Sequence, residues 1–466
     1  MFIGREKELA LLEKLKNSSK FEFLVLFGRR RIGKTTLLTE FAKDKNVLFY
    51  SAQEQNDAFN LEQFTKEIQK HFKETGFSFN SWQDAFEYIS NHSTNEHKEI
   101  IIIDEFPFIA KENPTVKSIL QHLIDHKLQH QNILLIICGS SISFMENEVM
   151  GYKSPLYGRC TNVLELKEFD YFDSANFLPE YSNLDKLLSY AILGGIPKYL
   201  QQFDDGISLK ENVKDKIVSN DVFLNIEPQL LLKMELKDIA TYSTILGAIA
   251  TGASKLNDIS LKAHLESTTC NKYLSVLKTL RLIHKTIPFK DSENSKKGLY
   301  TISDNLFNFV YHFIVPRRSA IDLLGEDVVT DEIFEPNLIN TYVGHIFEKI
   351  CTQYMVRLAR AKKLPFMPTK IGRWWGNNPI RKCQDDIDIA LCDSTEENYI
   401  ICECKFKNEP FSNEDFENML SRKDLIAKNA KVYYYAFSKS SFSDNVVKKS
   451  HANHVTLIGI DDLFEI

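Results

Sequence analysis

The sequence has no long hydrophobic run. Its longest apolar stretches, such as residues 133–138, are far shorter than the roughly 18 residues that a membrane-spanning helix needs. The first residues of the chain also lack the apolar segment of a secretory signal peptide. We therefore expect a cytoplasmic protein with no membrane partner.

Cysteine is sparse and shows no paired spacing. The eight cysteines include no C-x-x-C motif, which argues against both a disulfide framework and a structural zinc site. We expect them to behave as small, mostly buried hydrophobic residues.

Neither sign of charge dominates, since the formal net charge is -6 over 466 residues. This balance argues against histone-like binding of nucleic acid through overall charge. A protein with this net charge can still carry local basic patches. The composition, with 43% hydrophobic and 26% charged residues, is that of a globular protein. The length suggests about three domains.

The most specific motif is a glycine-rich loop, G-x-x-x-x-G-K-T, at residues 28–35. An apolar run precedes it and a helical pattern follows, which is the order that a P-loop requires rather than a basic turn before a surface helix. Gly28 and Gly33 let backbone N–H groups converge on a polyanion. Lys34 is expected on the β- and γ-phosphates and Thr35 on Mg²⁺. Further nucleotide-binding residues are expected in the same loop: Arg29, Arg30, Arg31, Ile32 and Thr36.

The segment 99–105 contains a second apolar run, residues 100–103, and ends in two acids. Its β-branched composition indicates a strand buried on both faces, and the acids make it a Walker B pattern. Asp104 is expected to hold Mg²⁺ through its water shell, and Glu105 to orient and deprotonate the attacking water. The alternative is a strand that happens to end in acids.

Two further residues are candidates for contacts with the nucleotide phosphates. Ser140 follows the strand 132–138, where it would either sense the γ-phosphate or cap the next helix. Arg159 would stabilise the leaving phosphates, in its own chain or on a neighbouring subunit, or would form a surface salt bridge. The sequence has no N-K-x-D element for guanine, which favours ATP over GTP.

These motifs resemble the archaeal-type P-loop ATPase family, within the STAND branch of AAA+-related NTPases. The family's opening motif matches residues 3–6, and its Gly-x-Pro element matches residues 195–197. The resemblance implies that Gly4 and Arg5 lie beside the adenine and that Pro197 forms a wall of its pocket. Without it, Gly-Gly-x-Pro indicates only a helix stop and a turn. Ser140 stands where many AAA+ proteins carry Asn.

The middle of the chain predicts a helical lid followed by a winged helix. Helical patterns at 242–250, 256–265 and 268–280 precede strands at 282–288 and 299–302. The third helix carries side chains that could face a DNA major groove: Thr269, Asn271, Lys272 and Lys278. In STAND-type proteins such a domain also closes over the nucleotide or contacts a partner.

The C-terminal region contains two strands with alternating polar residues, 384–391 and 399–407. Alternation places Asp386 and Asp388 on one face of their strand, and Glu403 and Lys405 on one face of theirs. Carboxylates and one ammonium group focused on a single point suit metal-assisted phosphodiester hydrolysis. Asp388 and Glu403 would bind Mg²⁺, and Lys405 would position the hydroxide.

This region resembles the PD-(D/E)XK nuclease superfamily, with Asp388 as the motif aspartate and residues 403–405 as E-x-K. The resemblance implies that Glu348 is a further metal ligand on a helix, while Asp386 replaces a more usual Glu. A solvated amphipathic hairpin is the structural alternative. Trp374 and Trp375 are either a buried pair or a platform for bases.

We therefore predict an α/β protein of five parts: a P-loop ATPase core with a parallel sheet (1–166), a helical lid (167–235), a winged helix (236–315), a linker (316–335) and a restriction-endonuclease-like α/β domain (336–466). The expected cofactors are ATP and Mg²⁺. The expected function is an ATPase that controls a nuclease-like domain acting on DNA. The alternative is a regulatory ATPase whose inactive nuclease-like domain binds nucleic acid or a protein partner, with homo-oligomers also expected as partners.

Overall fold

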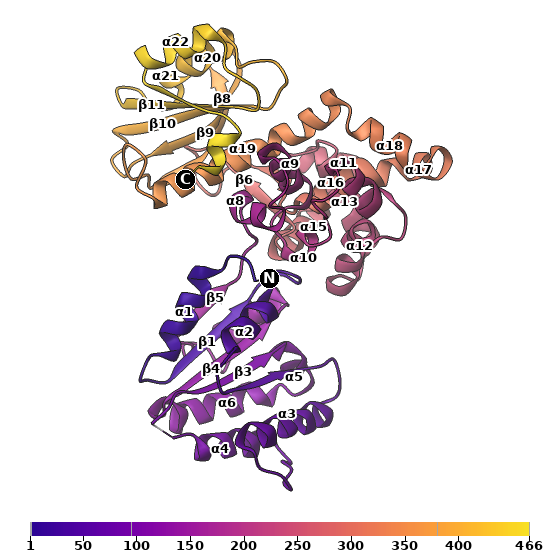
Figure 1. The fold of residues 1–466 in the computed structure, drawn as a ribbon, viewed down its shortest axis with the longest axis vertical. Coiled ribbons are helices and arrows are strands. Elements are labelled where there is room, and N and C mark those ends of the chain that lie inside the picture. The colour runs from indigo at the N-terminus through magenta and orange to yellow at the C-terminus, as the bar shows by residue number, and fades with distance from the viewer. Residues whose placement is uncertain (1, 95, 380, 466) are drawn as a thin grey trace. The chain divides into compact units, whose positions relative to one another are not determined.

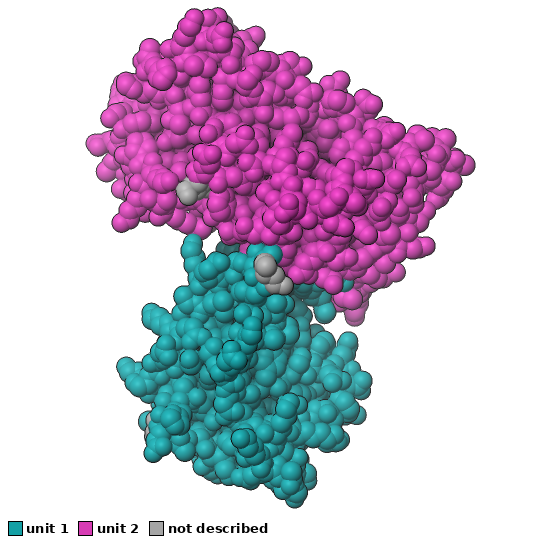
Figure 2. Space-filling model, viewed as in Figure 1, with its two compact units in different colours: residues 1–168 teal, residues 169–466 magenta. Residues whose placement is uncertain are grey.

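The computed structural model describes residues 2–94, 96–379 and 381–465. It divides into two compact units, residues 1–168 and 169–466, which Figure 2 colours separately. Each unit contains its own five-stranded sheet (Figure 1). Within the described ranges, no helix is long and apolar enough to cross a membrane.

The first unit is built on a parallel sheet with the strand order β2-β3-β4-β1-β5. Its strands are β1 (Glu22–Phe27), β2 (Val47–Ser51), β3 (Glu99–Asp104), β4 (Ile133–Gly139) and β5 (Asn162–Glu165). Its helices are α1 (Glu6–Lys16), α2 (Lys34–Ala42), α3 (Asp57–Phe72), α4 (Trp82–His92), α5 (Phe106–Glu112), α6 (Thr115–His126) and α7 (Ile142–Phe144). The predicted α/β fold with a parallel sheet is confirmed.

The central strands of this sheet are apolar because both of their faces are covered. Phe23 and Val25 of β1 share one hydrophobic cluster with residues of α3, α4, α5 and α6. Leu24 and Leu26, which point to the opposite face, are also fully buried. The sheet is therefore rigid, and its strands end at a fixed edge.

The second unit begins with helices and a small antiparallel pair of strands. Its elements up to residue 333 are α8 (Tyr171–Ser174), α9 (Asn183–Leu193), α10 (Pro197–Leu200), α11 (Leu209–Val213), α12 (Phe223–Glu235), α13 (Ile239–Ala250), α14 (Leu256–Lys262), α15 (Ser267–Thr279), β6 (Ile283–Thr286), β7 (Leu299–Ile302), α16 (Asn305–Phe309), α17 (Arg318–Leu324) and α18 (Glu326–Ile333). Residues of α13, α14, α15, β6 and β7 share one core, which is the element order predicted for a winged helix.

The segment predicted as a linker, 316–335, is helical over α17 and α18. Ile321, Val329 and Ile333 are buried at helical spacing. The many acids between them made this segment resemble a polar linker in the sequence. Two of those acids form ion pairs with lysines of earlier helices, Asp331 with Lys210 at 2.6 Å and Asp327 with Lys214 at 3.1 Å.

The second sheet has the order β12-β11-β10-β9-β8. Its elements are α19 (Pro336–Arg360), β8 (Lys370–Asn378), β9 (Cys383–Cys392), β10 (Asn398–Lys405), α20 (Asn413–Ser421), α21 (Lys423–Ile426), β11 (Lys431–Ser438), α22 (Asp444–Ala452) and β12 (Val455–Ile458). Strands β8, β9 and β10 pair antiparallel, whereas β10, β11 and β12 pair parallel. Helix α19 packs on β9 and β10, and a core that includes α20 and α22 covers the other face.

A bulge interrupts β9 at Asp388 and Ile389. Gly372 pairs with Ala390 and Trp374 pairs with Ile387, so that two residues of β9 oppose the single residue Arg373 of β8. A bulge of this kind bends the strand and turns a side chain away from strict alternation. It therefore decides where the carboxylate of Asp388 points.

We expect Gly195→Ala to destabilise the second unit by at least about 2 kcal/mol. A Cβ on Gly195 would lie 1.8 Å from the backbone oxygen of Phe169, which cannot move aside as a flexible side chain can. The urea or thermal unfolding midpoint measures the effect. The control is Gly344→Ala, within α19, where a Cβ meets no atom within 4 Å and alanine favours the helix. Equal midpoints for the two variants would contradict this packing.

Candidate functional site

The P-loop joins β1 to α2 in the first unit, and its two glycines have separate structural roles. A Cβ on Gly28 would lie 2.5 Å from the backbone oxygen of Leu166, so only glycine fits there. Gly33 precedes α2 with a φ of 91°, in the left-handed region. Arg31 is also left-handed, at a φ of 68°. The loop therefore turns sharply and leaves the N-terminus of α2 open to an anion.

Lys34 lies inside this loop. Its Nζ donates to the carbonyl oxygens of Gly28 at 2.9 Å and Arg29 at 3.0 Å, and the residue is 5% exposed. Burial lowers the pKa of Lys34, and the nearby carboxylates of Glu105 and Asp104 oppose that effect. An anionic phosphate in the loop would satisfy the same ammonium group more fully than carbonyl oxygens do.

Thr35 and Asp104 meet across the sheet edge. The Thr35 Oγ1 donates to Asp104 Oδ2 at 2.6 Å, and Asp104 is only 1% exposed at the end of β3. A hydroxyl and a carboxylate oxygen are ligands that suit Mg²⁺, which keeps several of its own waters in such sites. The donor set therefore fits the predicted cation.

Glu105 contacts Ser140, which follows β4. The Ser140 Oγ donates to Glu105 Oε2 at 2.9 Å, and its backbone N–H donates to the same oxygen at 3.3 Å. Helix α7 begins after Ser141 with no side-chain cap, so the hydroxyl of Ser140 does not cap that helix. The left-handed backbone of Glu105, with a φ of 51°, turns its carboxylate toward this contact.

The remaining predicted nucleotide-binding residues are distributed over both units. Arg5 is 8% exposed and donates to the backbone oxygen of Ile32 at 3.3 Å, so the motif that includes Gly4 lies against the P-loop. Arg29 and Arg30 are partly exposed, and Thr36 is exposed. Pro197 begins α10 in the second unit, and its place beside an adenine stays a prediction.

Arg159 lies at the opposite edge of the first sheet. Arg159 lies before the first residue of β5, which runs parallel to β1, whereas the P-loop begins after the last residue of β1. The length of β1, about 17 Å, therefore separates Arg159 from the P-loop. Its guanidinium forms two hydrogen bonds with Asp125, at 2.8 and 2.7 Å. The salt-bridge alternative therefore describes Arg159 in this chain, and a role on its own P-loop is not supported. A role on a neighbouring subunit stays a prediction.

Sequence reasoning missed one contact of the Walker B acid. Cys138, in β4, was expected to be only a buried hydrophobic residue, but its thiol hydrogen-bonds Asp104. Burial raises the pKa of Cys138 well above its usual value, and the charge of Asp104 adds to that shift. The thiol therefore remains a neutral donor. Only the parallel pairing of β3 with β4 reveals this contact.

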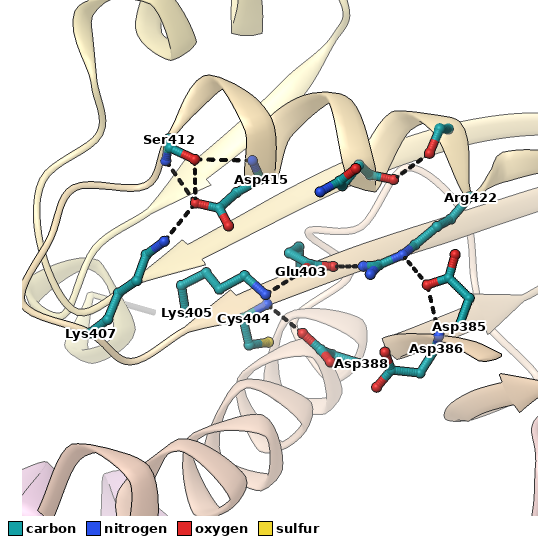
Figure 3. A network of polar contacts seen from close by, with 12 residues as sticks. Asp385, Asp386, Asp388, Glu403, Cys404, Lys405, Lys407, Ser412, Asp415 and Arg422 are labelled. Atoms are coloured by element: carbon teal, nitrogen blue, oxygen red, sulfur yellow. Dashed lines mark hydrogen bonds and ion pairs between the residues drawn. The ribbon is translucent and has the colours of Figure 1, made fainter. Parts of the chain in front are cut away.

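A second cluster of charged residues surrounds the bulge in β9 (Figure 3). Asp388 Oδ2 accepts the backbone N–H of Cys404 at 2.8 Å. The final pair of the β9–β10 ladder joins Ile389 to Cys402, so Asp388 lies where the two strands separate. Burial raises the pKa of Asp388 well above its usual value, and the charges of Glu403 and Glu348 raise it further.

Fixed cations hold the other carboxylates of this cluster. Glu403, 2% exposed, accepts from Lys405 Nζ at 2.6 Å and from Arg422, which also binds Asp385 at 2.9 Å. Burial lowers the pKa of Lys405, but the carboxylates of Glu403 and Asp388 outweigh it and raise the value.

A second arginine, Arg373 of β8, connects helix α19 to strand β9. Arg373 binds Glu348 of α19 at 3.1 Å and also binds Asp386. In the part of the chain that the structure describes, no group of three or more His, Cys, Asp or Glu side chains could hold a metal ion. A cation here would therefore rest on two carboxylates and its own waters, as Mg²⁺ commonly does.

The charges of this cluster leave a surplus of carboxylates. Five acids lie in it, and three arginine or lysine side chains pair with them: Glu348, Asp385, Asp386, Asp388 and Glu403 against Arg373, Lys405 and Arg422. His345 also pairs with Glu348, at 3.9 Å. The donors are hard oxygen ligands, and the surplus suits one divalent cation. Neither arginine was predicted, because no local motif links residues so distant in the sequence.

Known proteins place the chain in a family. A model described as an ATPase domain predominantly from Archaea matches residues 2–203, and a model of archaeal and bacterial proteins of unknown function matches residues 310–423. An uncharacterized protein of Methanocaldococcus jannaschii is 34% identical over 408 residues, which cover 88% of each chain. The chain belongs to this family of archaeal ATPases.

Further similarities are to one shorter protein and to two solved structures. An uncharacterized ATP-binding protein of M. jannaschii is 43% identical over 47 residues, 10% of this chain and 80% of that protein. The Walker-type ATPase of Pyrococcus abyssi has a TM-score of 0.49 and 20% identity, covering 66% of this chain and 96% of that one. The Aeropyrum pernix ORC2 protein, in ADPNP–ADP complexes, has a TM-score of 0.39 and 14% identity over 68% and 95%.

We expect Arg422→Met to cost about 2–4 kcal/mol of stability, because it leaves the buried Glu403 and Asp385 without their shared cation. The matched control is Lys449→Met, whose ion pair with Glu417 is exposed and contributes about 0–1 kcal/mol. Urea unfolding measures both. If the two variants unfold at the same urea concentration, the Arg422 pairs are not structurally important.

Proposed function

We propose that this P-loop ATPase is a STAND-type switch in which ATP hydrolysis in the first unit controls a nuclease-like centre in the second. The observation that carries the ATPase part is the convergence of Lys34, the Thr35–Asp104 pair and the Glu105–Ser140 pair at one sheet edge. These groups come from three separate segments, yet each has the chemistry that a triphosphate requires.

In the proposed reaction, Lys34 and the N–H groups at the start of α2 bind the β- and γ-phosphates. Thr35 and Asp104 would hold Mg²⁺, which supplies charge neutralisation on the phosphates when it is bound. Glu105 accepts a proton from the attacking water. Ser140 holds the Glu105 carboxylate before the γ-phosphate enters, and its hydroxyl is then available to that phosphate.

We expect Lys34→Ala to abolish ATP binding and hydrolysis, because it removes the buried ammonium group at the start of α2. Glu105→Gln should still bind ATP but hydrolyse it at least about a hundredfold more slowly, since an amide cannot accept the proton. Phosphate release and equilibrium binding of a labelled ATP analogue measure the two effects. Lys66→Ala, which removes only an exposed ion pair on α3, is the control. Hydrolysis by Glu105→Gln at the normal rate would contradict this role.

For the rest of the chain, we propose the four parts expected from the sequence: a lid (167–235), a winged helix (236–315), a linker (316–335) and a PD-(D/E)XK-like domain (336–466). Asp388 and Glu403 would supply the two carboxylates for a divalent cation, and Lys405 the ammonium group, beside a DNA phosphodiester. Glu348, expected as a third ligand, is instead paired with Arg373. The surplus of carboxylates over cations supports this proposal. Asn271, Lys272 and Lys278 of α15 are exposed and are available to DNA or to a partner.

The second candidate is a regulatory ATPase whose nuclease-like domain binds nucleic acid or a partner, a neighbouring copy included, without cutting. One observation favours it: Arg422 and Lys405 already satisfy the Glu403 carboxylate, so a cation must compete with two fixed charges. Cleavage separates the two candidates.

We expect nicking of plasmid DNA by the full chain in Mg²⁺ or Mn²⁺, and its loss in Asp388→Asn, in Lys405→Ala and in excess EDTA, while ATP hydrolysis by both variants persists when Mg²⁺ is present. Lys407→Ala is the matched control, because Lys407 pairs with Asp415 rather than with Glu403. A gel assay with and without ATP measures nicking. If no nucleic acid is cut under any of these conditions, the nuclease proposal fails and the binding candidate stands.

A further inference from the structure

The second unit contains a surface cavity whose lining residues do not include the five acids of the charged cluster at the bulge. Its volume is about 540 Å³, and its lining comes from the loop after β6, from β8, from the β9–β10 turn and from the region of α21. This volume lies within the usual range of small-ligand sites. Six of its lining residues have groups suited to ligand recognition: Lys290, Trp374, Asn377, Tyr399, Asp424 and Lys428. We call this cavity the Trp374 pocket.

The indole of Trp374 has a fixed orientation in this pocket. A Cβ on Gly376 would lie 3.1 Å from Trp374 Cζ2 and 3.5 Å from Cη2, so the ring lies close over the glycine two residues further along β8. Trp374 also packs against the apolar core that includes α20 and α22. Trp374 is nevertheless only partly buried, which leaves part of its aromatic surface accessible to a ligand.

The polar groups of the pocket are held around this aromatic surface. Lys290 Nζ donates to the hydroxyl of Tyr399 at 2.7 Å and pairs with Glu396 at 3.0 Å. Tyr399 in turn donates to Glu396 at 2.7 Å. The network fixes one ammonium group at the wall of the pocket, while Lys428, Asn377 and Asp424 are exposed at its rim.

This combination matches the chemistry of a nucleobase with its phosphate. A base stacks on an aromatic face regardless of its identity. The amide of Asn377 and the carboxylate of Asp424 can bond a base edge, and lysines attract the phosphate. A lipid would require a more apolar lining, and the cavity is too small for a duplex.

We propose that the Trp374 pocket binds a single nucleobase with its attached phosphate, presented by a single strand or by a free mononucleotide. Trp375 pairs with Asp386, whereas Trp374 pairs with Ile387, so the two tryptophans point to opposite faces of the edge strand β8. The base would therefore lie on the face of β8 opposite Trp375 and Asp386. The nucleic-acid role proposed above guides only the choice of ligand, and binding here requires no cleavage.

Fluorescence anisotropy with labelled oligothymidylate (dT)12 and the full chain tests this proposal. Trp374→Leu should weaken binding by about five- to a hundredfold, the range for loss of one stacked base. Trp374→Phe should lose less, because it keeps a ring. Trp375→Leu is the matched control and should change affinity less than twofold. Lys428→Gln should reduce the slope of log affinity against log salt by about 0.7. Unchanged ATP hydrolysis and unfolding midpoints show that the variants are folded.

Competition by dTMP distinguishes the two sources of the base. If dTMP displaces (dT)12 and Trp374→Leu weakens both, the pocket accepts a free mononucleotide as well as a strand. If dTMP does not compete while (dT)12 binding still depends on Trp374, the ligand is a strand. Equal effects of Trp374→Leu and Trp375→Leu, or binding of duplex alone, would overturn the proposal.

Asp388→Asn separates the pocket from the proposed nuclease centre. This variant should bind (dT)12 as tightly as the unmodified chain, even if no protein of the series cuts DNA. If (dT)12 binding is retained and no DNA is cut, the result supports the Trp374 pocket and rejects the nuclease proposal. Intact cleavage together with (dT)12 binding that is insensitive to Trp374 rejects the pocket and leaves the nuclease standing.

Discussion

The pairing of β4 with both β1 and β3 is the constraint on which the nucleotide site depends. Because these strands are parallel, their carboxyl ends lie at one edge, and the segments that follow them meet there. The P-loop follows β1, Asp104 ends β3, and Ser140 follows β4. The pairing is held by apolar residues buried on both faces of the sheet, so the positions of the polar groups depend on hydrophobic packing behind them.

The two charged centres of this ATPase have opposite electrostatic character. In the P-loop, Lys34 and the N-terminus of α2 present positive charge, and two backbone oxygens accept hydrogen bonds from the ammonium group. That arrangement attracts a polyanion without any further change. Around the bulge of β9 the carboxylates outnumber the cations, so a phosphodiester would be repelled until a cation or a proton neutralises them.

Arg422 and Arg373 keep the acidic cluster compact. A buried carboxylate without a partner is costly, and each arginine bridges two acids from different elements. The same pairs restrict the freedom of Glu403 and Glu348 to bind a metal. The cluster is therefore both a structural connection between α19, β8, β9 and β10 and the candidate centre for chemistry, and stability and activity would be in competition there.

The sequence by itself determined the P-loop, the Walker B strand, the parallel α/β sheet of the first unit and most helices and strands of the second. Those features depend on local periodicity, on glycines with special backbone roles and on spacing within one segment. Tertiary structure alone decided the pairing of Arg159 with Asp125, the thiol contact of Cys138, the bulge that directs Asp388 and the helical form of 316–335. The contacts join residues distant in the chain, and the bulge exists only in the pairing of two strands. Residues 316–335 are helical because neighbouring helices bury the few apolar residues of this segment.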